Sequence, residues 1–69
     1  MTQCEIVLRH LNDFGQIDQL EAIREYGIMR LASRINDLRN EGHKIKTEMT
    51  SGKNRYGEKT SYAVYSLEK

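Results

Sequence analysis

The stretch that decides the fold is LEAIREYGIMRLASRINDL, residues 20–38, in which two helical apolar patterns flank a single glycine. Before the glycine, apolar residues recur at helical spacing at Leu20, Ala22, Ile23 and Tyr26. After it, they recur at Leu31, Ala32, Ile35 and Leu38. Gly27 tolerates a positive φ and therefore ends the first of these helices. We predict two short helices joined by a tight turn, which is a helix-turn-helix candidate.

A further helix is predicted upstream, over residues 3–13. Thr2 and Glu5 have the spacing of a capping box, in which a hydroxyl and a carboxylate satisfy each other's end amides. The apolar residues that follow at helical spacing are Cys4, Val7, Leu8, Leu11 and Phe14. Gly15 supplies a stop, and Ile17 is expected only to bridge this helix to the next.

A β-hairpin is predicted downstream of Gly42, where the apolar period changes from about 3.6 to about 2. Residues 45–49 alternate as a strand, residues 50–57 read as a polar turn, and residues 60–67 form a second strand rich in Tyr, Val and Thr. An isolated two-stranded hairpin is marginal in water, so it must pack on the helices. Of its two faces, we favour as core-facing the one with Ala63, Tyr65 and Leu67 over the one with Tyr62 and Val64.

The predicted fold class is therefore α+β, with three helices and a C-terminal two-stranded β-hairpin in a single domain over residues 1–69. One cysteine excludes an internal disulfide framework, so packing alone must stabilise the chain. No apolar run approaches the roughly 18 residues of a membrane span, and no charged-then-apolar leader follows Met1. We expect a cytoplasmic protein.

The charge is divided unevenly along the chain. Residues 1–29 carry two basic against five acidic residues, a net charge of −3, whereas residues 30–59 carry eight against four, a net charge of +4. This division favours one basic face and a polyanionic partner, with chance clustering in a short chain as the alternative.

Catalytic and metal-binding patterns were sought without success. The Cys and His residues are Cys4, His10 and His43, whereas a tetrahedral zinc site usually needs four such ligands. Ser33 and Ser66 have no His in a recognisable motif, and no phosphate-binding glycine loop is present. We expect no enzyme activity, no metal, no cofactor and no small-molecule ligand.

Several short motifs carry a family resemblance over residues 4–67. They are Tyr-Gly-Ile at 26–28, Arg-Ile-Asn-Asp-Leu-Arg at 34–39, Gly-His at 42–43, Asn-Arg-Tyr-Gly at 54–57 and Tyr-Ala-Val-Tyr-Ser-Leu at 62–67. With these motifs the chain resembles winged helix-turn-helix DNA-binding domains, and more narrowly the small ones encoded by phages and prophages. The resemblance implies duplex DNA binding in a regulatory or replicative accessory role. The turn from Ile28 to Leu31 is about two residues shorter than in common winged-helix regulators, which leaves the docking angle of the third helix open.

Residues that could read DNA lie on the third helix and on the hairpin. An α-helix fits the major groove, where Arg bonds to guanine and Asn to adenine. At about 100° per residue, the candidates on its outer side and one flank are Arg30, Ser33, Arg34, Asn36 and Asp37, with Asp37 orienting Arg34. Those of the hairpin, for phosphate or minor-groove contact, are Lys53, Asn54, Arg55 and Lys59. The alternatives are surface ion pairs on the helix and a charged tip that keeps the hairpin from pairing with its neighbours.

Other functions of the same fold stay open. A module of this size buries roughly 600–1,000 Å² on DNA, so useful specificity would need a dimer or a partner protein. One rival is a winged-helix protein–protein interaction module, a phage protein that binds a host or phage protein. A second rival is a homodimerisation domain that uses Met29 and the face with Tyr62 and Val64.

Overall fold

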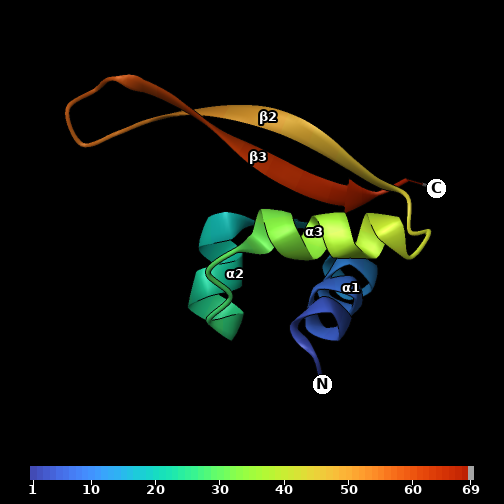
Figure 1. Cartoon of the computed structure of the whole chain (residues 1–69). Helices are drawn as coiled ribbons and strands as arrows, with labels where there is room; N and C mark the ends of the chain where they lie inside the picture. Colours follow the sequence, from blue (N-terminus) through green and yellow to red (C-terminus); the bar gives the residue numbers. More distant parts are fainter. Residues whose placement is uncertain (69) are drawn as a thin grey trace.

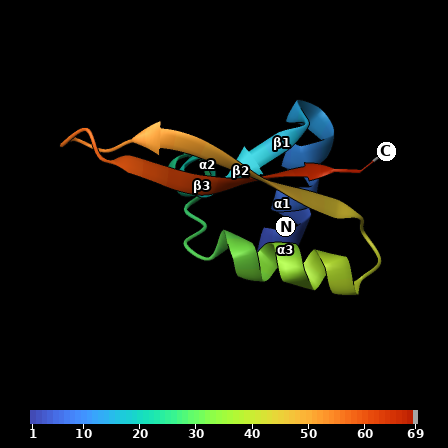
Figure 2. The same ribbon diagram turned by 90° about the horizontal axis from the view of Figure 1, so that it is seen from above.

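The computed structural model describes residues 1–68, which form three helices and a three-stranded antiparallel sheet. The helices are α1 (Gln3–Phe14), α2 (Gln19–Tyr26) and α3 (Leu31–Asn40). The strands are β1 (Gln16–Asp18), β2 (Ile45–Lys53) and β3 (Lys59–Leu67), in the spatial order β1-β3-β2. All three helices lie on one side of the sheet, and the β2–β3 hairpin projects beyond α2 (Figure 1). Seen from above, α3 runs alongside the hairpin (Figure 2).

The starts of the first two helices follow the predicted capping chemistry. The Thr2 hydroxyl accepts a hydrogen bond from the Glu5 backbone N–H at 3.2 Å, and the Glu5 carboxylate accepts one from the Thr2 backbone N–H at 3.2 Å. This capping box was predicted and is confirmed. The Asp18 carboxylate accepts from the backbone N–H of Glu21 at 2.8 Å, and α2 ends at Gly27, whose φ is 67°.

The strand β1 corrects the prediction that Ile17 only bridges two helices. Ile17 is opposite Tyr65 of β3 and is fully buried, so the sheet has three strands rather than the predicted two. A three-residue strand with one buried side chain carries no alternation that a sequence can display. Tertiary pairing with β3 is what creates it.

The hairpin is longer than predicted. β2 continues through residues 50–53, which the sequence analysis placed in a turn, and the actual turn comprises residues 54–58. Lys53 is opposite Lys59 at the end of the ladder, and Gly52 is opposite Thr60. This part of the hairpin extends past the helices, so neither of its faces needs to be apolar. The alternation that marks a half-buried strand is therefore missing from residues 50–53.

The core lies between the helices and the inner face of the sheet. Its buried apolar residues are Val7, Leu11, Ile17, Ala22, Ile28, Leu31, Ile35, Leu38 and Ile45. Tyr65 and Leu67 pack against this core, which confirms the predicted inner face of β3. Leu20 and Ile23, predicted in the apolar stripe of α2, are instead 68% and 40% exposed. On α2 only Ala22 is fully buried, because this short helix meets the core along a narrow line.

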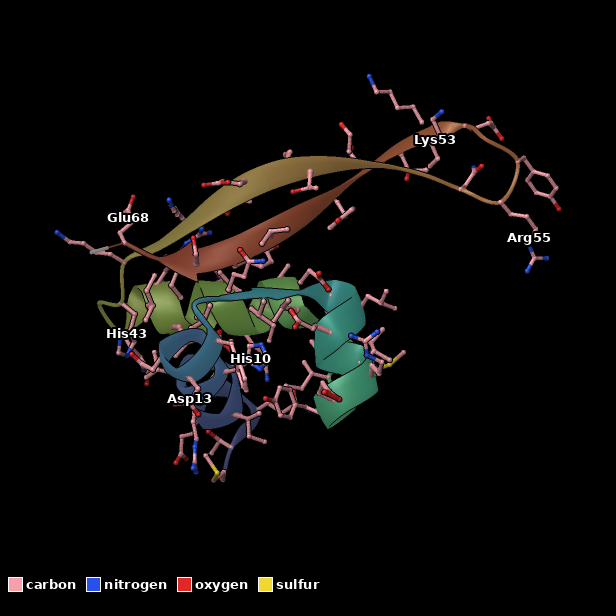
Figure 3. The ribbon with its side chains drawn as sticks, turned by 180° about the vertical axis from the view of Figure 1, so that it is seen from behind. His10, Asp13, His43, Lys53, Arg55 and Glu68 are labelled. Atoms are coloured by element: carbon pink, nitrogen blue, oxygen red, sulfur yellow. The ribbon has the colours of Figure 1, made fainter. Side chains whose placement is uncertain are left out.

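His10 connects α1 to α2 from a nearly closed position (Figure 3). Its side chain is 4% exposed, and Nδ1 lies 2.6 Å from the Tyr26 hydroxyl. Nε2 lies 3.7 Å from a carboxylate oxygen of Glu21. This buried histidine therefore has a structural place in the packing of the two helices, which no spacing in the sequence indicates.

Candidate nucleic-acid interface

The turn between α2 and α3 is held by the carboxamide of Gln19. Its Nε2 donates to the Ile28 carbonyl at 2.8 Å, and its Oε1 accepts from the Leu31 backbone N–H at 2.9 Å. Ile28 and Leu31 are both fully buried, so one side chain satisfies two backbone groups at the edge of the core. The short turn that the sequence analysis noted is thus fixed in place, and the start of α3 is fixed with it.

Arg30 lies outside the helix on which the sequence analysis placed it. It is the N-cap residue of α3, with φ −125° and ψ 65°, and its side chain makes no capping hydrogen bond. Its predicted angular position on the helix is therefore wrong. Arg30 and Arg34 instead line one shallow depression together with Gln3, Gly27 and Met29. The structure brings these two predicted residues together, and adds the first turn of α1, which the sequence did not suggest.

Arg34 and Asp37 form an ion pair on the side of α3 that faces α1. The Arg34 Nη2 lies 3.2 Å from Asp37 Oδ2, and the Arg34 side chain is 35% exposed. Asp37 Oδ2 also lies 4.0 Å from the Cys4 sulfur on α1. Burial, together with the nearby Asp37 charge, raises the pKa of the Cys4 thiol, so the group stays a neutral thiol. The predicted orientation of Arg34 by Asp37 is present as this contact, but on the α1 flank.

The outward surface of α3 is polar and uncharged at its centre. Its exposed residues include Ala32, Asn36 and Asn40, whereas Ser33 is half-buried. Of the predicted residues, Asn36 therefore has the most freely presented side-chain amide on this helix. An amide of this kind can donate and accept at once, which is the pattern that an adenine edge requires.

Arg39 ties the last turn of α3 to the edge of β2. Its Nε and Nη2 donate to the Ile45 carbonyl at 3.0 and 2.7 Å, and Nη2 also donates to the Thr47 hydroxyl at 2.8 Å. A lysine could not make this forked contact, because it presents a single point of charge. The sequence analysis assigned Arg39 no role, since only the folded chain shows that β2 passes beside this flank of the helix.

The tip of the hairpin is a built turn that presents cations. The Asn54 side-chain oxygen accepts from the backbone N–H groups of Tyr56 and Glu58 at 2.9 and 3.0 Å. The predicted DNA-contacting oxygen of Asn54 is thus used to shape the turn. Arg55 lies at the far end of the hairpin and Lys53 near it (Figure 3). Lys53 stands directly opposite Lys59, and like charges placed in this way repel each other.

A comparison with protein-family models follows the same arrangement of helices and strands. A family model described as a winged helix-turn-helix domain matches residues 2–69. The chain belongs to this winged helix-turn-helix family. No curated protein and no solved structure matches it.

Membership of the winged helix-turn-helix family suggests DNA binding, and such domains are typically non-enzymatic. In winged helix-turn-helix terms, α3 is the recognition helix and the β2–β3 hairpin is the wing. Within residues 1–68, no three His, Cys, Asp or Glu side chains gather as a metal site would require. Over the same residues, no helix has the length and apolarity needed to cross a bilayer.

Proposed function

We propose that this winged helix-turn-helix protein binds duplex DNA, with α3 in the major groove and the wing against the neighbouring backbone or minor groove. The observation that carries the proposal is the clustering of three cations on the wing, where Lys53 stands opposite Lys59 beside the exposed Arg55. A pair of opposed lysines is costly without a counter-charge. DNA phosphates would supply that charge, and their binding would release condensed counterions.

The proposed roles on the recognition helix differ with position. Asn36, on the outward surface, would read a base edge, and Arg30 at the start of α3 would bond to guanine or to a phosphate. Ser33 would donate to a phosphate. Arg34 would approach the backbone from the α1 flank, with Asp37 fixing its guanidinium.

The proposed roles on the wing divide between contact and shape. Lys53, Arg55 and Lys59 would bind phosphates or enter a narrow minor groove. Asn54 would act through the turn that its side chain builds, which sets the direction of Arg55. The motifs shared with small phage and prophage domains support a cytoplasmic regulatory or replicative accessory role for a single domain over residues 1–69.

Backbone amide NMR with a duplex of about 20 base pairs at low salt tests the proposal. We expect shifts concentrated at residues 30–37 and 53–59, reversed by added salt. Neutralisation of three to five phosphates predicts a slope of about −3 to −4.5 for log K against log salt. Binding that does not depend on salt, or no shifts at all in the folded protein, would refute it. The protein–protein interaction module would then become the leading function.

A pair of double variants separates specific contact from net charge. Arg30→Ala with Arg34→Ala removes two charges from the start of α3, and we expect at least a tenfold loss of affinity. Arg9→Ala with Arg24→Ala removes two charges from α1 and α2, so it leaves the same net charge on the protein. Equal losses of affinity in the two double variants would mean that α3 is not the reading helix.

A further inference from the structure

Part of one strand edge has no partner in the fold. β1 pairs only with residues 64–66 of β3, so along residues 59–63 that edge meets no strand of the described chain, residues 1–68. Beyond Asp18 the chain turns into α2 and leaves this edge open.

The direction of the backbone groups on this edge follows from the ladder. The backbone N–H groups of Asn54 and Glu68 donate to the carbonyls of Glu58 and Lys44, at the two ends of the β2–β3 hairpin. Hydrogen-bonded pairs alternate in an antiparallel ladder, so even-numbered residues of β3 bond to β2. Odd-numbered residues therefore point their N–H and C=O groups away from β2. On the open edge these residues are Lys59, Ser61 and Ala63.

The two open edges of the wing are not equivalent. The edge of β2 is blocked at Ile45, whose carbonyl is taken by Arg39, and it carries the charged pair Lys46 and Glu48. Charges and capped carbonyls are the usual means by which proteins prevent edge pairing. In contrast, residues 60–63 of β3 carry no charge.

The open edge of β3 also borders an apolar groove. The groove is lined by Asp18, Gln19, Leu20, Ile23 and Tyr62. Leu20 and Tyr62 are 68% and 45% exposed, so apolar area remains to be buried beside the strand. An open edge next to exposed apolar side chains is the arrangement that strand addition uses.

We propose that residues 59–63 pair antiparallel with the same residues of a second copy of this chain. The register centres on Ser61, which faces the partner's Ser61, and places Lys59 opposite the partner's Ala63. The segment is bounded by the turn at one end and by β1 at the other. A two-fold axis at Ser61 therefore uses the open edge of both copies over its full length.

Hydrogen bonding selects the same register. Every facing pair formed by Lys59, Ser61 and Ala63 joins two outward-pointing residues, so each is a hydrogen-bonded pair. Centring on an even-numbered residue would place the outward N–H and C=O groups opposite non-bonding positions. The contact is short, so the dimer forms weakly and with rising concentration. It leaves α3 and the β2 edge uncovered, and it joins two proposed DNA-reading modules into one particle.

Sedimentation equilibrium of the protein without DNA tests the pairing, so its outcome is independent of the proposed function. We expect the mass to rise with concentration from 8.1 kDa toward twice that value. Ser61→Pro removes an outward N–H at the centre of the interface, and it should abolish the rise. Ser51→Pro is the matched control, because Ser51 is opposite Ser61 in the hairpin and points to the other edge. A protein that stays at 8.1 kDa up to millimolar concentration overturns the proposal.

Cysteine cross-linking provides a test that does not need a proline in a strand. In a Cys4→Ser background, Ser61→Cys should form a disulfide dimer rapidly, since facing Cα atoms in a hydrogen-bonded pair lie about 5.5 Å apart. Ser51→Cys, on the other edge, should cross-link at least tenfold more slowly. Equal rates for the two variants would overturn the register.

Discussion

The Gln19 side chain holds Leu31 by its backbone N–H at 2.9 Å, and so fixes the start of α3 from the start of α2. The same carboxamide donates to the Ile28 carbonyl at 2.8 Å. One polar residue therefore sets the geometry of the short turn between the two helices. The direction of the proposed recognition helix depends on it.

Loss of this carboxamide should destabilise the protein. Gln19→Ala leaves the Ile28 carbonyl and the Leu31 N–H without their partner, so we expect the free energy of unfolding to fall by about 2–3 kcal/mol. Urea unfolding measures the change. Gln3→Ala, on the exposed surface of α1, should stay within about 0.5 kcal/mol. A loss of similar size in both variants would count against the clamp.

The two apolar residues around the start of α2 should differ sharply. Ile17→Ala removes a fully buried side chain of β1, and we expect a loss of about 2–5 kcal/mol. Leu20→Ala removes a side chain that is 68% exposed, and the loss should be within about 0.5 kcal/mol. Thermal or urea unfolding of the pair decides the matter. A neutral Ile17→Ala would mean that β1 does not form.

Tyr26 should contribute through its hydroxyl. Tyr26→Phe leaves the buried His10 Nδ1 without its partner at 2.6 Å, which should cost about 1–3 kcal/mol. Tyr62→Phe makes the same chemical change on the wing, where the side chain is 45% exposed, and should be nearly neutral. If the two variants unfold at the same urea concentration, the His10–Tyr26 contact adds nothing.

Arg39 should matter for its shape as well as for its charge. Arg39→Lys keeps the charge but loses the fork on Ile45 and Thr47, so we expect about 0.5–1.5 kcal/mol of lost stability. Amide exchange along β2 should also become faster. Arg9→Lys, on a side chain that is 71% exposed, is the control. Unchanged exchange in Arg39→Lys would show that β2 is held by the sheet alone.

The capping box should give the protein a defined pH dependence. The Thr2 backbone N–H, and then the Thr2 hydroxyl, lower the pKa of Glu5 below its ordinary value of 4.5. Because the folded pKa is lowered, the stabilisation by Glu5 is fully present above pH 4.5 and is lost as pH falls through the folded pKa. The stability difference between wild type and Glu5→Gln should therefore shrink in acid. Urea midpoints measured across this range would reveal a constant difference if the cap were absent.

The capped helices and the core stripe of α3 could be predicted from the sequence, because their signals are local. A capping box spans three residues, and Leu31, Ile35 and Leu38 repeat with the period of one helix. The inner face of β3, with Tyr65 and Leu67, could be predicted for a similar reason. Each signal needs only neighbours along the chain.

Only the tertiary structure decided the rest. β1 exists because β3 returns beside Ile17, and the Gln19 and Arg39 contacts exist because distant segments lie next to them. The sequence placed Arg30 on a helix face and Arg34 toward DNA, whereas the turn and α1 determine where both lie. Local periodicity reports which side of an element is buried. It cannot report which neighbour covers a flank, because that depends on contacts between residues far apart in the chain.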